Sequence, residues 1–166
     1  MKTIVLSAND VLKWIEEFKG DDFYHKNDSG FFTVNDLKYT GLDLIGEGVD
    51  TLKFFIIYND SDIISVIKYS EKLYHYQLEH IQNAWCINYL EIAKSYQNKG
   101  LLKEVCTIFA KTFDKEVFCS NAESREGKIA SVNSQLRKSF TSNGKQFFDS
   151  EDDYVDYIIE TEKNTI

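Results

Sequence analysis

Apolar positions follow two spacings along this chain, and together they predict most of its strands and helices. Runs rich in Phe and Ile at 51–58 and 63–69 flank the polar turn Asn59–Asp62, which predicts an antiparallel hairpin. Similar short runs at 2–6, 85–93 and 116–120 are predicted as further strands. A weak alternation at 37–44 is compatible with another strand.

Helical spacing appears in three places, where apolar residues recur every three or four positions. The predicted helices cover 11–18, 101–113 and 126–140. Asn9 and Asp10 are capping candidates for the first helix, and Gly20 is expected to end it. The segment 85–120 is therefore a strand–helix–strand unit, in which the two strands should be parallel and joined by a right-handed crossover.

The C-terminal part is predicted to add two short strands, at 147–148 and 154–159, around the acidic turn 149–153. A tail that begins at Glu160 should be frayed. Residues 19–36 are expected to be helix plus loop, and 71–84 a loop or a strand extension. The order of elements predicts an α/β (α+β) fold. Its mixed, mostly antiparallel central sheet has a parallel β-α-β crossover and helices on both faces.

Composition fits a single domain over residues 1–166, with 43% hydrophobic and 28% charged residues. The net charge of −8 argues against general nucleic-acid binding. An acidic surface suits a cationic amine substrate but also serves solubility. We find no signal peptide and no membrane-spanning run, and the three separated cysteines suit a reducing compartment, so a cytoplasmic protein is expected.

The junction between the strand at 85–93 and the following helix is the main candidate for a ligand site. Gly100 lies in the short polar turn there, directly before the helical run. The first N–H groups of a helix have no partner inside it, and the helix dipole adds positive potential. Such a junction binds anions, especially phosphates.

The sequence of this turn resembles that of the GCN5-related N-acetyltransferase superfamily, in which the turn reads Arg/Gln-x-x-Gly-x-Gly/Ala. Gln97 and Gly100 match the pattern, whereas Leu102 stands where the family has Gly or Ala. Asn133 matches a position on the family's later helix, and the resemblance extends over 51–159 in element order. It implies an acyl-CoA N-acyltransferase-like fold and an acetyl-CoA-dependent transfer of an acetyl group to an amine of a small molecule or protein.

The resemblance also implies which residues bind acetyl-CoA. The phosphates would lie over the turn and helix start, with charge from two lysines, and the pantetheine arm would pair with the end of the strand. Asn133 would add a hydrogen bond, although it also suits a plain surface position. The implied cofactor-binding residues are Ile92, Ala93, Lys94, Gln97, Asn98, Lys99, Gly100, Leu101, Leu102, Lys103 and Asn133.

Acetyl transfer needs a base for the amine and a proton for the departing thiolate. Strand alternation puts Cys86, Asn88 and Leu90 toward the acceptor, and Glu91 on the other face unless a bulge turns it. Glu91 is the candidate catalytic base, although a structural role is the competing interpretation. Other acceptor-side candidates are Glu79, His75 and His80, and the spacing of these histidines does not suggest a metal site.

Phe140 occupies the position where the family usually has a Tyr that donates the proton, and Phe has no proton to donate. Tyr154, Tyr157 or a water would then serve, or the chain is a weak or inactive acetyltransferase-like binding protein. Aromatic residues in 69–85 suit a partner surface or a homodimer interface. A third alternative is a protein-binding α+β domain unrelated to this family.

Overall fold

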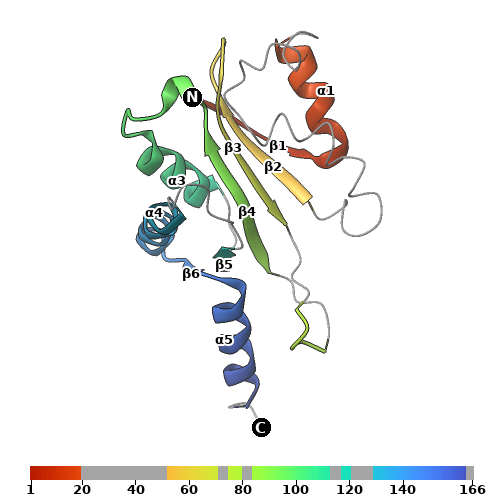
Figure 1. Ribbon diagram of the computed structural model, residues 1–166, viewed down its shortest axis with the longest axis vertical. Helices are drawn as coiled ribbons and strands as arrows, with labels where there is room; N and C mark the ends of the chain where they lie inside the picture. Colours follow the sequence, from red (N-terminus) through yellow and green to blue (C-terminus); the bar gives the residue numbers. More distant parts are fainter. Residues whose placement is uncertain (20–51, 71–74, 80–83, 113–116, 121–128, 164–166) are drawn as a thin grey trace.

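The computed structural model describes residues 1–19, 52–70, 75–79, 84–112, 117–120 and 129–163, and the account below concerns these. One six-stranded sheet runs in the order β1-β2-β3-β4-β5-β6 (Figure 1). Its strands are β1 Lys2–Ser7, β2 Leu52–Tyr58, β3 Ile63–Ser70, β4 Trp85–Ile92, β5 Val117–Ser120 and β6 Gln146–Phe148. The helices are α1 Ala8–Lys19, α3 Leu101–Thr112, α4 Ile129–Ser142 and α5 Glu151–Lys163, with a 3-10 turn, η3, at Lys94–Tyr96.

The sheet is mixed. Strands β1 to β4 pair antiparallel, and this includes the predicted hairpin of β2 and β3. Strands β4, β5 and β6 pair in parallel, with α3 between the first two and α4 between the last two. The parallel half puts the N-termini of α3 and α4 after the carboxyl ends of β4 and β5, respectively.

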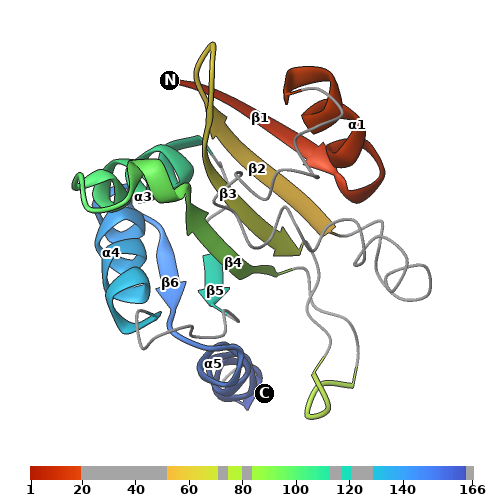
Figure 2. The same ribbon diagram turned by 45° about the horizontal axis from the view of Figure 1, so that its top comes forward.

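Helices cover both faces of the sheet, as the sequence predicted. Helices α3 and α4 lie side by side on one face, and α1 lies across the other (Figures 1 and 2). The larger core fills the space under α3 and α4, with Phe109 and Phe140 fully buried against Phe55 and Ile87. Val11 and Ile15 of α1 pack on the opposite face against a second cluster. The predicted face of 126–140 is confirmed at Leu136 and Phe140, which are buried.

The prediction of a strand at 154–159 is wrong, because these residues belong to α5. Tyr154 and Val155 are buried there, with Ile158 and Ile159 one turn later on the same side. Ser150 caps this helix, since its Oγ accepts a hydrogen bond from the N–H of Asp153 at 3.1 Å. The cap and an acidic first turn favour a helix over the local β-propensity. The helix continues to Lys163, so the predicted fraying from Glu160 is also wrong.

The first helix begins one residue before the predicted cap. Ala8 is its first residue, so Ser7 takes the capping position, and the Ser7 hydroxyl donates to the Asp10 carboxylate at 3.0 Å. The predictions for 20–51, including Gly20 as a helix end and the strand at 37–44, lie outside the described residues. Among the helices that are described, none has the length and apolar character needed to cross a membrane.

Candidate cofactor-binding site

Strand β4 has a β5 partner over only part of its length. The parallel pairing covers three residues, from Trp85 opposite Phe118 to Ile87 opposite Ser120. Strand β4 continues to Ile92, and within the described chain the segment 88–92 has no neighbour on that side. The first three residues of β4 thus pair with the last three of β5, and among the described residues the second half of β4 is unpaired on this side.

A β-bulge lies where this pairing ends. Tyr69 pairs with Ile87 and Lys68 with Tyr89, so Asn88 is an extra residue in β4. A bulge reverses the alternation of faces beyond it. Cys86 and Glu91 therefore lie on the same face of the sheet, because their partners Ser70 and Val66 do.

This register corrects the predicted orientation of two β4 side chains. Leu90, expected beside Cys86, instead packs against the core under α3 and α4. Glu91, which plain alternation put on the other face from Cys86, lies on its face and is partly exposed there. The backbone carbonyl of Glu91 accepts a hydrogen bond from the buried Ser65 hydroxyl at 2.8 Å. That bond holds β4 against β3 at this position.

The backbone groups at the end of β4 divide between its two sides. The N–H of Ala93 donates to the carbonyl of Ile64 at 2.9 Å, so Ala93 and Glu91 are directed toward β3. Because successive residues of a strand point their N–H and C=O groups to opposite sides, Leu90 and Ile92 are directed toward the open side. The predicted cofactor-binding residues included Ile92 but not Leu90. The bulge at Asn88 decides which residues of β4 point to the open side, and its position was not visible in the sequence.

The turn after β4 has an unusual backbone. Asn98 and Gly100 both have positive φ, 61° and 72° respectively. This left-handed region is natural for Gly and tolerated by Asn. A Cβ at Gly100 would meet nothing within 4 Å, so the space beside the turn is open. The two left-handed residues turn the chain into α3. Gln97 to Gly100 are exposed in this turn.

The N–H groups of the first turn of α3 point toward the turn that precedes it. Those of Leu101, Leu102 and Lys103 come before the first i→i−4 bond of the helix and have no acceptor within it. Lys99 and Lys103 are exposed beside them. Leu102, where the family pattern has Gly or Ala, packs partly against the core instead. A helix start with free amides and nearby ammonium groups attracts anions.

Two of the predicted site residues have structural contacts. The Gln97 side-chain amide donates to the carbonyl of Ile92 at 2.9 Å, which ties the turn to the end of β4. Asn133 on α4 donates from Nδ2 to the carbonyl of Asp149 at 3.2 Å. Its Oδ1 is buried and has no partner among the described residues. A buried acceptor without a donor is uncommon and suits a ligand that supplies an N–H group.

The position expected for a proton donor lies in the core. Phe140 is fully buried, stacked on Phe147 with ring centroids 5.5 Å apart. A Tyr there would bury its hydroxyl among apolar rings. Of the two alternatives on α5, Tyr154 is 8% exposed and Tyr157 is 43% exposed.

The acceptor-side candidates before β4 are not gathered at the open edge. His75 is buried, and its Nε2 donates to the Asp152 carboxylate at 2.9 Å, because the N–H of Gln77 donates to Nδ1. Glu79 is exposed, and His80 lies outside the described residues. No group of three or more metal-ligating side chains occurs within the described part of the chain.

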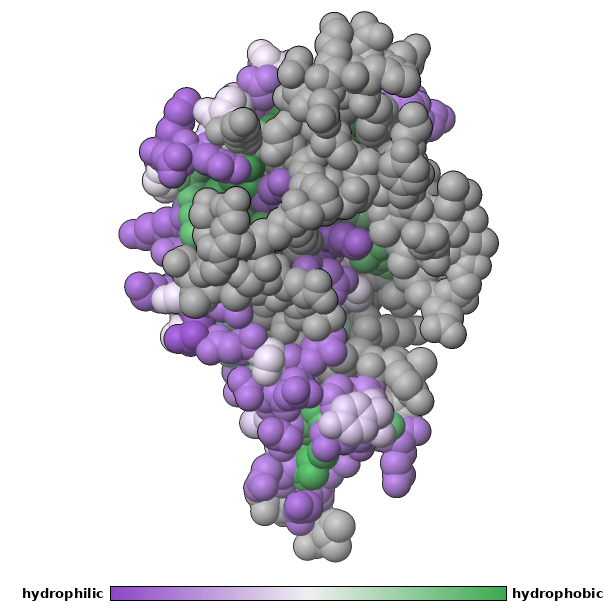
Figure 3. All heavy atoms as spheres, viewed as in Figure 1, coloured by the Kyte–Doolittle hydropathy of each residue, from purple (hydrophilic) through white to green (hydrophobic). Residues whose placement is uncertain are grey.

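The predicted acidic turn at 149–153 contains an ion pair at Asp149 and the first turn of α5 from Glu151 onward. The Asp149 carboxylate accepts two hydrogen bonds from the Arg137 guanidinium, at 2.7 and 3.2 Å. Glu151 begins α5, and partial burial raises the pKa of its carboxyl. Figure 3 shows the face of the molecule that is seen in Figure 1. The described surface there is mostly hydrophilic, with a small hydrophobic area over α5.

Comparisons with known proteins give similarity at the level of structure only. No protein-family model and no curated protein sequence matches the chain. An aminoglycoside acetyltransferase from an uncultured soil metagenomic sample is 16% identical, with a TM-score of 0.43, over 87% of this chain and 86% of that one. A ribosomal-protein-alanine N-acetyltransferase from Brucella melitensis is 10% identical, with a TM-score of 0.46, over 82% and 91%. An aminoglycoside N-acetyltransferase in complex with CoA is 12% identical, with a TM-score of 0.45, over 81% and 89%.

The chain resembles the GCN5-related N-acetyltransferases. This resemblance rests on the turn at Gln97 to Leu102 and on the order of the elements around it. Because their TM-scores are below 0.5, they decide nothing about ligand or chemistry. The function below is argued from the residues of this chain.

Proposed function

We propose that this chain is an acetyl-CoA-dependent N-acetyltransferase that acts on an amine of a small molecule or protein. The observation that carries the proposal is the second half of β4, which has no neighbour on the β5 side among the described residues and leads directly into a left-handed turn and the N-terminus of α3. An extended arm that carries phosphates at one end fits this combination. Backbone pairing would hold the arm and the helix start would hold the phosphates.

Specific residues would hold each part of the cofactor. The amides from Asn98 to Lys103 would bind the pyrophosphate, with charge from Lys99 and Lys103. Leu90 and Ile92 would pair with the pantetheine arm through the backbone groups on the open side of β4. The buried Oδ1 of Asn133 would accept an N–H group of the ligand.

Acetyl-CoA supplies the acetyl group and a thiolate that leaves. In the transfer a C–N bond forms to the amine and the C–S bond breaks. The amine must be neutral to react, and Glu91 would take its proton. The bulge at Asn88 supports this role, because it puts the Glu91 carboxylate on the face opposite α3 and α4.

A binding protein without catalysis is the second candidate, and the burial of Phe140 favours it. The described residues then provide no tyrosine at the position expected for the proton donor. The two candidates share the cofactor site and differ only in turnover.

The first experiment measures CoA binding by calorimetry for Gly100→Trp, with Gly144→Trp as the matched control. Both glycines have nearly the same φ, 72° and 70°, and open space beside them, so the backbone strain is comparable. A Trp at Gly100 would cover the turn amides, and we expect CoA affinity to fall by about 100-fold or more, whereas Gly144→Trp keeps it. Absence of CoA binding by the wild type at millimolar concentration would overturn the cofactor site.

The second experiment tests catalysis with Glu91→Gln. We expect kcat for acetylation of an amine panel to fall by about 10² to 10⁴, with CoA affinity unchanged. Wild-type CoA binding without turnover of polyamines or peptide amines would favour the binding protein. Full activity of Glu91→Gln would remove Glu91 from the mechanism.

A further inference from the structure

The turn between β2 and β3 contacts η3, which directly precedes the candidate cofactor turn at 97–100. Both lie at the same end of the sheet (Figures 1 and 2). The Tyr96 hydroxyl donates to the Asp62 carboxylate at 2.8 Å and accepts from the Asn59 amide at 3.1 Å. The hydroxyl therefore has both a donor and an acceptor from the same hairpin turn.

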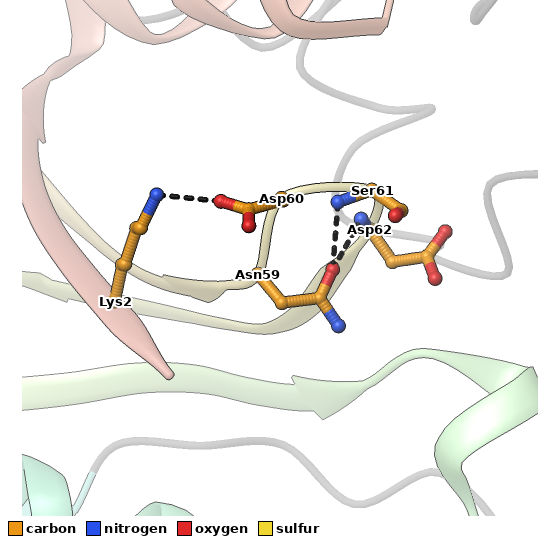
Figure 4. Close-up of polar contacts among 5 residues, drawn as sticks. All are labelled: Lys2, Asn59, Asp60, Ser61 and Asp62. Atoms are coloured by element: carbon orange, nitrogen blue, oxygen red, sulfur yellow. Dashed lines mark hydrogen bonds and ion pairs between the residues drawn. The ribbon is translucent and has the colours of Figure 1, made fainter.

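The hairpin turn is itself ordered by Asn59. Its side-chain Oδ1 accepts from the N–H groups of Ser61 at 2.9 Å and Asp62 at 2.7 Å (Figure 4). These two bonds fix the side-chain amide, with its NH₂ group left to donate to Tyr96. In Figure 4 the Asp60 carboxylate points toward Lys2, whereas the Asp62 carboxylate points the opposite way.

Tyr96 connects this hairpin to the residues that would hold the phosphates. Its ring lies between the two main core clusters and is only partly exposed. Its N–H donates to the carbonyl of Ala93 at 2.8 Å, which closes η3 at the end of β4. The Lys99 ammonium lies 5.6 Å from the ring centroid, in cation–π range.

We propose that Asn59, Asp62 and Tyr96 form a positioning network that sets the conformation of the turn 97–100 and the direction of Lys99. This inference rests on the proposed function, because the turn is the proposed phosphate site. A turn with two residues at positive φ, one of them the non-glycine Asn98, is held in place by contacts from outside the turn. The network provides these contacts from one side and Gln97 from the other.

The experiment compares Tyr96→Phe and Asp62→Ala with the matched control Asp60→Ala. Tyr96→Phe removes the hydroxyl and keeps the ring under Lys99. Asp60 lies in the same hairpin turn, is largely exposed, and reaches Lys2 rather than Tyr96. We expect CoA to bind about five- to tenfold more weakly to the first two variants, with a raised KM and unchanged kcat, and normally to the control.

A second readout separates this inference from the proposed function. In the ligand-free protein, backbone ¹⁵N order parameters at 98–100 should fall in Tyr96→Phe and Asp62→Ala, from about 0.85 toward 0.6. They should stay unchanged in Asp60→Ala. Unchanged order parameters in a folded Tyr96→Phe would overturn the network, whereas failure of the wild type to bind CoA would overturn the proposed function alone.

Discussion

Phe109 is a side chain of α3 that attaches this helix to the sheet. It is fully buried. Its ring centroid lies 5.3 Å from that of Phe55 on β2, 5.8 Å from Tyr69 on β3 and 5.9 Å from Phe140 on α4. One side chain therefore joins α3 to two central strands and to the neighbouring helix.

Replacing Phe109 by Ala removes the ring and leaves a cavity among rigid aromatic neighbours. Fully burying a Phe contributes about 1.5–3 kcal/mol from transfer alone. The cavity and the lost aromatic pairs add to this, so we expect the free energy of unfolding to fall by about 3–5 kcal/mol. That loss is a large fraction of the roughly 5–15 kcal/mol typical of a domain.

Urea unfolding followed by circular dichroism and by the fluorescence of the two tryptophans would measure this loss. Tyr76→Ala is the control for aromatic truncation, because Tyr76 is 82% exposed. It should change the free energy of unfolding by less than about 0.5 kcal/mol. A loss of less than about 1.5 kcal/mol in Phe109→Ala, with an unchanged m value, would refute the assigned role of this ring.

Three further predictions follow from local contacts. Because the folded state raises the pKa of Glu151, it binds this proton more tightly than the unfolded state does. The contribution of Glu151 to the free energy of unfolding should therefore be largest at low pH and fall as pH rises through the raised pKa, and in urea melts Glu151→Gln should lack this contribution. Burial raises the pKa of Cys106 to about 12, so a thiol reagent at neutral pH should modify it only after unfolding, and modification of the native protein would contradict this. Ser150→Ala removes the cap of α5 and should cost about 0.5–2 kcal/mol in urea unfolding, whereas no loss would show that the cap bond is dispensable.

The local pattern of apolar residues was sufficient to predict the elements in which the apolar spacing is regular. The hairpin of β2 and β3 follows from two apolar runs around Asn59–Asp62, and α3 follows from the spacing between Leu101 and Phe109. These elements bury one stripe or face, and burial imposes its period directly on the sequence. The turn that opens α3 was also recognised, because Gly100 marks it.

Elsewhere the sequence permitted two structures, and contacts between distant segments selected one. Tyr154 to Ile159 has the composition of a strand, yet the cap at Ser150 and the burial of Tyr154 and Val155 make it a helix. Secondary structure of such short segments depends on tertiary packing as much as on propensity.

The sequence by itself determined the strand and helix order around Gly100. Only the tertiary structure decided that β5 ends opposite Ile87 and that Asn88 bulges next to this point. It also decided that Tyr96 joins the β2–β3 hairpin to the turn. The reason is that period and capping are local properties of the chain, whereas cross-strand register and side-chain hydrogen bonds join residues that are distant in sequence.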